Sequence, residues 1–270
     1  MGLADDYADA IHGQQKLYAT WWPNARVQPG DYGTLSGRRF RRLGHINDAP
    51  LLVDVKVKVD APTARYRMEL AHEEASVTKF GAGVEVAVGV VSAKPGLKVS
   101  FESRFGFYML LGGATVRRID NLAAIKPRIE ALAESDDDDP RKWDDRRWVL
   151  VTEVIEATNG LVLLSKKRGT EIVLEATADV PNIDLAGGQI GFTVRRDSTS
   201  TQQFFPERAP LHLTPLMALA HVDRGLFGRG AATLADKLGG GGPPEPTKAR
   251  LIEMGGIDTD ELGPLLREEG

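Results

Sequence analysis

The chain has 270 residues, of which 42% are hydrophobic, and its formal net charge is −4. This length supports a substantial hydrophobic core, and the charge gives no general argument for nucleic-acid binding. The absence of cysteine excludes disulfides, thiolate catalysis, Cys-ligated zinc and palmitoylation of this chain.

The N-terminal segment is expected to begin with a short helix. Residues 1–6 are polar and acidic and lack the features of a signal peptide, so we expect the chain to be cytoplasmic as made. A helix over Ala4–Thr20 would end before Pro23, because the residue before a proline is disfavoured in the helical region. Alternating apolar and polar residues over 51–59 then predict a strand with one solvated face.

A long β-ribbon is predicted over Arg65–Leu111, with a turn at Lys94-Pro95-Gly96 and an end at Gly112-Gly113. Side chains of a strand alternate between its two faces, so apolar residues at every second position predict an amphipathic ribbon. The apolar residues of this face are Val84, Val86, Val88, Val90, Leu97, Val99, Phe101, Phe105 and Phe107.

Thr115–Glu134 has apolar residues at helical spacing, and Pro127 is expected to kink this helix or split it. The acidic run Asp136–Asp139 lacks the spaced ligands and central glycine of an EF-hand loop, which favours a solvated loop.

A second ribbon is predicted over Trp148–Ala178, with a hairpin at Asn159-Gly160, because Asn-Gly suits a type I′ turn. Arg168-Gly169 could add a further turn or a bulge. The last strands are expected over Gln189–Arg196 and Leu211–His221, although a short helix could begin at Pro215. The apolar residues of the second ribbon are Val149, Val151, Ile155, Leu161 and Leu163.

The C-terminal part differs in composition from the rest. Residues 1–238 are expected to form a core domain, residues 239–246 a Gly/Pro linker, and residues 247–270 a tail containing two short helices over Thr247–Met254 and Thr259–Arg267. From Pro243 onward seven acidic and three basic residues give a charge of −4. The tail suits a releasable cover, and a frayed appendage or a partner-binding segment fits equally well. Its apolar anchors are Leu251, Ile252, Leu262, Leu265 and Leu266.

No motif of an enzyme is present. The five histidines are scattered, with no HExxH spacing, and there is no GxSxG, P-loop or GxGxxG pattern. We therefore name no catalytic, cofactor-binding or metal-ligating residue. A third possible function is a hydrolase whose site is assembled from scattered residues, but no motif supports it.

Several basic doublets lie near predicted ribbon ends and helix starts. They could gather on one surface, where anionic lipid headgroups attract basic residues at roughly 1 kcal/mol per charge. Nucleic acid competes for the same charges but ranks lower without a recognition helix or an RNP motif. The lipid-contact candidates are Arg117, Arg118, Arg146, Arg147, Lys166, Lys167 and Arg168.

The two ribbons allow two interpretations. Each strand taken alone favours a half-buried antiparallel sheet under helices. The same alternation also suits strands that later face lipid on one side and a water-filled pore on the other.

The strand Trp148–Glu156, with the sequence WVLVTEVIE, resembles the TEV strand of the pore-forming domains of gasdermins, particularly compact bacterial members. The order of parts is also similar: an early segment Pro29–Ile46, a long ribbon, an amphipathic helix before the TEV strand, and the glycine-rich approach Gly187–Gly191 to the last strands. The likeness covers roughly residues 20–225. Bacterial members often carry a lipidated cysteine near the N-terminus, which this chain lacks.

The resemblance implies a latent pore-forming protein. A twisted sheet with helices around it would be kept inactive by the short tail until a protease removes it. The cut is expected between about Phe227 and Pro246, with Arg229, Gly239 and Gly242 as candidates. A latent monomer would then form a homo-oligomer on membrane lipids and rebuild both ribbons into transmembrane hairpins.

We therefore expect an α+β fold, with a twisted, mostly antiparallel sheet, flanking helices and a short C-terminal tail. The expected function is non-enzymatic: a cytoplasmic protein that permeabilises the cell's own inner membrane in defence against phage, with no cofactor and no nucleic-acid partner. The alternative is a binding or scaffold domain whose tail recruits another protein.

Overall fold

The computed structural model describes residues 2–23, 25–48, 52, 56–61, 66–80, 85–86, 90–91, 95–135, 142–144, 147–176, 192–196, 201–204, 213–223, 249–254, 256–257 and 266–268. Within them are two helices, α1 (Leu3–Gln15) and α2 (Leu122–Glu134). The strands are β1 (Tyr18–Ala19), β2 (Asp31–Ser36), β3 (Arg39–His45), β4 (Tyr66–Ala71), β5 (Ala75–Phe80), β6 (Glu85–Val86), β7 (Val90–Val91), β8 (Gly96–Phe101), β9 (Gly106–Arg118), β10 (Trp148–Ser165), β11 (Thr170–Ala176), β12 (Phe192–Arg196), β13 (Thr201–Phe204), β14 (Leu213–Asp223), β15 (Arg250–Glu253) and β16 (Leu266–Glu268).

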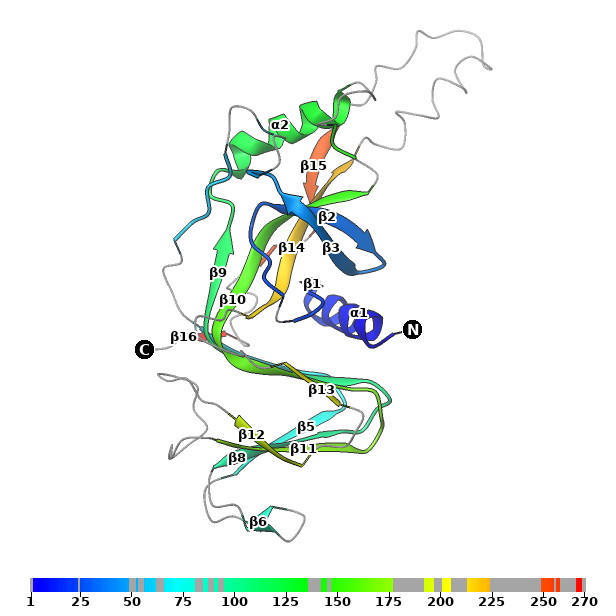
Figure 1. Cartoon of the computed structure of the whole chain (residues 1–270), viewed down its shortest axis with the longest axis vertical. Coiled ribbons are helices and arrows are strands. Elements are labelled where there is room, and N and C mark those ends of the chain that lie inside the picture. The colour runs from blue at the N-terminus through cyan, green and yellow to red at the C-terminus, as the bar shows by residue number, and fades with distance from the viewer. Residues whose placement is uncertain are drawn as a thin grey trace, which may run out of the picture.

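Two antiparallel sheets form the body of the described chain. The larger sheet has ten strands, in the order β1-β14-β10-β9-β4-β16 with β2, β3, β13 and β15 attached at its sides. The smaller sheet has the order β12-β11-β8-β5, and β6 pairs with β7 separately. In Figure 1, α2 lies at the upper end of the large sheet, α1 lies beside its middle, and the small sheet lies under its lower end. The predicted α+β class, with a mostly antiparallel sheet and flanking helices, is confirmed.

The long ribbon of β9 and β10 runs through the whole molecule. The two strands pair without interruption of register from Ser165 opposite Gly106 to Glu153 opposite Arg118. Side chains from this ribbon enter four hydrophobic clusters, which lie at different levels of the ribbon or on its opposite faces. One cluster lies under α1, one under α2, one between the two sheets and one under β2 and β3.

Two glycines allow this ribbon to change the face that it turns inward. In β9, residues 107, 109 and 111 enter the cluster under α1, and then residues 114 and 116 do so. In β10 the same change separates residues 155 and 157 from residues 162 and 164. Gly113 and Gly160 lie at the change and have φ angles of 57° and 142°, a region that favours glycine. Figure 1 shows the ribbon bending beside β16, which pairs with β4 next to Leu111 of β9.

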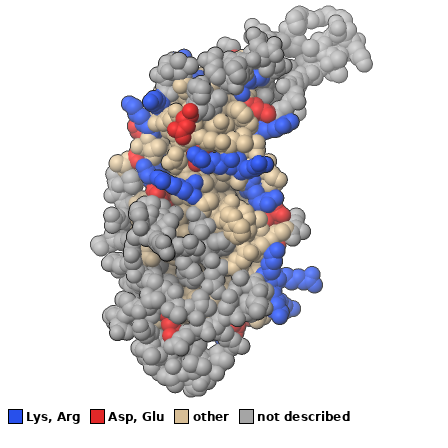
Figure 2. Space-filling model, viewed as in Figure 1, with Lys and Arg blue, Asp and Glu red and all other residues tan. Residues whose placement is uncertain are grey.

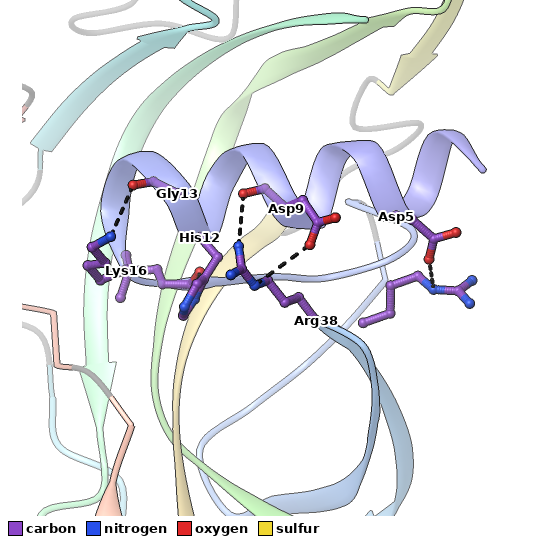
Figure 3. Close-up of polar contacts among 8 residues, drawn as sticks. Asp5, Asp9, His12, Gly13, Lys16 and Arg38 are labelled. Carbon is purple, nitrogen blue, oxygen red and sulfur yellow. Dashed lines mark hydrogen bonds and ion pairs between the residues drawn. The ribbon is translucent and has the colours of Figure 1, made fainter. Parts of the chain in front are cut away.

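Helix α1 covers one face of the large sheet. Leu3, Tyr7 and Ile11 are buried against the ribbon, as their spacing on one helix face requires. The opposite side of the helix is fastened to the β2–β3 hairpin. The Asp9 carboxylate lies 3.6 Å from Nε of Arg38, and the Asp5 carboxylate 2.8 Å from Nε of Arg39 (Figure 3).

Helix α2 covers the upper end of the sheet and runs from Leu122 to Glu134 with Pro127 inside it. The helix is therefore not split at Pro127, which was one of the two outcomes expected there, and it begins later than predicted. The residues from Thr115 to Arg118 belong to β9, because they pair with β10. Ile125, Ile129 and Ala133 are fully buried in the cluster under α2.

The predicted hairpin at Asn159-Gly160 is wrong. Strand β10 continues through both residues, because β9 provides a partner on each side of them. In the described residues Lys16 is the one non-glycine residue with positive φ, so Asn159 does not adopt the conformation of a type I′ turn. The turn lies instead between β10 and β11, at residues 166–169, where Gly169 has φ of 72°.

The first ribbon also differs from its prediction. Gly112-Gly113 does not end a strand, because β9 continues through both. Gly96, expected in a turn, begins β8, which pairs with β5 and β11. Of the last strands, β12 and β14 confirm the expected strands, and Pro215 lies within β14 and not in a helix.

Glycine at position 160 is expected to be essential for this ribbon. A Cβ there would lie 2.2 Å from the carbonyl oxygen of Leu110, so Gly160→Ala should destabilise the protein by about 1–3 kcal/mol. Urea denaturation measures the change. Gly169→Ala is the matched control, since φ is also positive there but no atom lies within 4 Å of the added Cβ. An equal loss in both variants would contradict the importance of the close approach to β9.

Candidate functional site

The described part of the tail begins with a strand that extends the large sheet. β15 pairs antiparallel with the outer edge of β14, from Ala220 opposite Glu253 to Asp223 opposite Arg250. The N–H of Met254 continues this pairing and donates to the carbonyl of Leu219 at 2.7 Å. The short helix predicted over Thr247–Met254 is therefore wrong in the described residues 249–254. The helix predicted over Thr259–Arg267 lies outside the described residues, except for Leu266 and Arg267, which lie in strand β16. An open sheet edge supplies the backbone partners that a short isolated helix would have to make within itself.

The far side of β15 meets helix α2. The N–H of Ala249 donates to Oε1 of Glu134, and the N–H of Leu251 donates to Oε1 of Glu130, both at 2.8 Å. Hydrogen bonds to a carboxylate are stronger than those between neutral groups. The tail strand is therefore held from both sides, by backbone on one and by carboxylates on the other.

Apolar side chains of the tail enter three clusters of the core. Ala249 and Leu251 are 4% and 3% exposed and complete the cluster under α2, together with Ile129 and Trp143. Ile257 is 3% exposed and enters the cluster under α1. Met254, between them, packs against the cluster under β2 and β3.

A charged clamp holds the tail at Ile257. Its N–H donates to Oε2 of Glu153 at 2.6 Å, and its carbonyl accepts from Nη2 of Arg118 at 3.3 Å. Nε of Arg118 lies 3.6 Å from Oε1 of the same glutamate. Burial raises the pKa of Glu153, the bond from Ile257 and the charge of Arg118 lower it, and Glu253 and Asp60 raise it again, so that the net shift is upward.

The last described segment of the tail closes the opposite edge of the large sheet. β16 pairs antiparallel with β4, from Leu266 opposite Met68 to Glu268 opposite Tyr66. The tail therefore provides a strand to both outer edges, at β14 through β15 and at β4 through β16. Unpaired edges present rows of free backbone groups to other chains, and this arrangement covers part of each.

The sequence anticipated the tail anchors in part. Leu251 is buried as expected, whereas Ile252 is 42% exposed because it points away from the core in β15. Leu266 lies in β16, and Leu262 and Leu265 lie outside the described residues. Ala249, Met254 and Ile257 were missed. The alternation of Ala249 and Leu251 with Arg250 is a strand signal that a helical interpretation overlooks.

The hairpin candidates do not share one face. Leu97, Val99, Phe101, Leu161 and Leu163 are fully buried together between the two sheets. The remaining candidates lie elsewhere: Phe107 and Ile155 in the cluster under α1 with Phe105 packed against it, Val149 and Val151 under β2 and β3, Val86 and Val90 in β6 and β7, and Val84 and Val88 outside the described residues.

In the first ribbon, the bend at residues 103–105 explains why the candidates do not share one face, because it separates β8 from β9. Strict alternation from Leu97 to Phe107 would need one continuous strand. Phe101 and Phe107 therefore enter different clusters.

The basic candidates lie at separate places. Arg117 pairs with Glu156 at 3.2 Å, next to the pair of Arg118 and Glu153. Arg147 lies before β10, is 77% exposed and pairs with Asp144. The exposed residues Lys166, Lys167 and Arg168 lie at the opposite end of β10, and Arg146 lies outside the described residues. The expectation that these residues gather on one surface is wrong.

A further group of arginines lies on β3 and before it. Figure 2 shows Lys and Arg side chains across the face at the height at which Figure 1 shows β2 and β3. Arg38, Arg39 and Arg42 each pair with a carboxylate, that of Asp9, Asp5 and Asp31 in turn. These arginines therefore help to hold α1 and β2 in place.

Two searches of the described residues bear on other kinds of site. No group of three or more His, Asp or Glu residues there could hold a metal ion. No helix among them is long and apolar enough to cross a membrane. The candidate cleavage residues Arg229, Gly239 and Gly242 lie outside the described residues.

Comparison with known proteins finds similarity among solved structures. No family model matches the chain, and no curated protein matches it. Among solved structures, a bacterial gasdermin from Bradyrhizobium tropiciagri is similar, with 14% sequence identity, a TM-score of 0.35, and coverage of 81% of this chain and 87% of that chain.

Truncation of Leu251 should loosen the tail. Leu251→Ala removes a buried side chain and is expected to lower the free energy of unfolding by about 2–4 kcal/mol, with faster hydrogen exchange at Met254. Ile252→Ala, the neighbouring control on the exposed side, should change stability by less than about 0.5 kcal/mol. Urea denaturation and amide exchange measure both variants. Equal effects would contradict the docking of this strand through its inner face.

The raised pKa of Glu153 has a defined effect on stability. The ordinary value is 4.5, and a raised value in the folded state means that folding favours the protonated form. The contribution of this group to stability is therefore present below pH 4.5 and is lost as the pH rises through the raised folded-state value. Wild-type stability relative to Glu153→Gln should therefore fall as the pH rises above 4.5.

Urea denaturation at several pH values measures this difference. The glutamine keeps an oxygen for the N–H of Ile257, and Glu73→Gln at an exposed turn is the control. If the stability of the wild type relative to Glu153→Gln stays constant or grows as the pH rises, the raised pKa of Glu153 is contradicted.

Proposed function

We propose that this chain is a latent pore-forming protein that its C-terminal tail keeps inactive and that proteolysis activates. The observation that carries the proposal is the course of the tail. It covers part of both outer edges of the large sheet and inserts Leu251 and Ile257 into clusters built by the rest of the chain. A segment with these contacts restrains the sheet that it covers.

The long ribbons support the membrane step. A strand needs about 9–11 residues to span a bilayer, and β9 and β10 have 13 and 18 residues. Part of their apolar surface is buried between the two sheets, beside Leu97 and Phe101 of β8. In the proposed pore, segments 65–111 and 148–178 insert as hairpins, after the two sheets separate and this surface becomes available to lipid.

The charged residues of the ribbon are paired across its two strands. Glu153 pairs with Arg118 and Glu156 pairs with Arg117. Because Glu153 and Glu156 are three residues apart, these pairs lie on opposite faces of β10, and one of them faces the water-filled lumen in the proposed pore. Sheet edges cannot remain unpaired in lipid. A few hairpins per chain therefore require many chains that close a ring, so a latent monomer gives a homo-oligomeric pore.

The proposed partners follow from this sequence of events. A protease cuts between about Phe227 and Pro246, and the exposed Lys166, Lys167 and Arg168 at the turn after β10 meet anionic headgroups. The target is the inner membrane of the cell that makes the protein, and its loss of integrity would stop phage replication. The TEV strand at Trp148–Glu156, which resembles gasdermins, supports this assignment.

The alternative function, a binding domain with a recruiting tail, requires tail residues that are available to a partner. Leu251 and Ile257 are 3% exposed, which favours a covering role for the part of the tail that contains them.

Leakage of dye from liposomes tests the proposal. A full-length chain carrying an engineered protease site at Gly239–Gly242 is expected to release dye only after it is cut, and more from anionic than from neutral vesicles, because basic residues at the turn are attracted to anionic headgroups. The natural chain treated with the same protease is the control. Leakage by the uncut chain, or none from the cut chain on either lipid, would contradict the proposed function.

A further inference from the structure

Helix α2 offers the tail strand what a neighbouring β-strand would offer. In β15 the N–H groups of successive residues point to opposite sides, as in any strand. The N–H of Met254 points to β14, whereas those of Ala249 and Leu251 point to α2. On that side the acceptors are the carboxylates of Glu134 and Glu130 in place of strand carbonyls.

The spacing of these carboxylates suits a strand. Residues four apart in an α-helix are separated by about 6 Å along its axis, and residues two apart in a strand by about 6.6 Å. Glu130 and Glu134 are four apart and receive N–H groups from residues two apart. The pairing also runs in opposite directions, because residue 249 binds residue 134 and residue 251 binds residue 130. One helix face therefore substitutes for the next strand of the sheet.

Only side chains on the inner face of β15 are buried against the core. Ala249 and Leu251 are buried under α2, next to Ile125, Ile129 and Ala133. Arg250, Ile252 and Glu253 are exposed. The groove between α2 and the edge of β14 consequently requires a small residue and a leucine two positions later, together with two free N–H groups. It does not constrain the identity of the other residues of the strand.

We propose that the groove between α2 and the edge of β14 is a strand-accepting peptide site that binds segment 249–254 in trans as well as in cis. Its ligand class is an extended peptide with a small residue and a leucine at alternate positions. The inference deepens the proposed function, since it describes how the inhibitory segment is held. Cutting the linker would then leave the tail bound, and release would depend on dissociation into a dilute solution.

Exchange of a labelled peptide tests this site without any membrane. The full-length chain with the engineered site at Gly239–Gly242 is cut and kept unfractionated. A fluorescein-labelled peptide of residues 247–258 is added, and anisotropy follows its binding. The unlabelled peptide is expected to compete with it, and the cut tail to co-elute with the core in gel filtration at high concentration and to separate on dilution.

Peptide variants identify the contacts and leave the protein unchanged. N-methylation of Leu251 removes the N–H that Glu130 receives and should weaken binding about tenfold or more. Leu251→Asp should abolish it. Ile252→Glu, on the exposed face, should bind as the natural peptide does and is the matched control. Equal binding of the N-methylated and natural peptides would overturn the proposal.

Protein variants test the helix. Glu130→Ala with Glu134→Ala should weaken peptide binding by more than tenfold, whereas Arg128→Ala, at an exposed position on the side of α2 away from Glu130, should not. The proposal would be overturned if the cut tail separated from the core at all concentrations in gel filtration and the labelled peptide did not bind. Because binding and leakage are separate readouts, a peptide that binds to a chain that never leaks contradicts the pore alone, and leakage without peptide binding contradicts the groove alone.

Discussion

The antiparallel ladder between β9 and β10 is the interaction on which the rest of the structure depends. It keeps one register from Gly106 to Arg118, and all four main clusters of the core contain side chains from one or both of these strands. The helices and the small sheet attach to it at different levels. Any rearrangement that separates the two sheets must therefore preserve this ladder or rebuild it.

A sheet organised around one central ribbon leaves edges, and these edges are the second constraint. β14 has β1 and β15 along its outer side, and β4 has β16. Residues far from the ribbon in sequence thus complete the sheet, with their contacts spread over backbone pairing, two carboxylates of α2 and the clamp of Glu153 and Arg118. The same few residues of the tail make hydrogen bonds, buried apolar contacts and contacts with charged groups. Removing these residues therefore removes all three kinds of interaction together.

The features that depend on local pattern could be predicted from the sequence. The class of fold, the presence of helix α1 and the burial of Leu251 could be predicted in this way. The helix expected over Ala4–Thr20 nevertheless ends at Gln15, because Tyr18–Ala19 pair with β14 as strand β1. Features that depend on distant partners could not be predicted. Asn159-Gly160 has the strongest local signal for a turn, yet β9 pairs with β10 on both sides of it. Likewise the threonines and leucines of the tail suggest helices, but the free edge of β14 makes residues 250–253 a strand.

The docked strand β15 carries two independent sets of positions. Its inner residues, Ala249 and Leu251, are constrained by the core, while Arg250 and Ile252 face outward. Substitutions on the outer side therefore leave docking intact and can accumulate freely during evolution. Related chains could diverge at Arg250 and Ile252 while they keep the same docked strand.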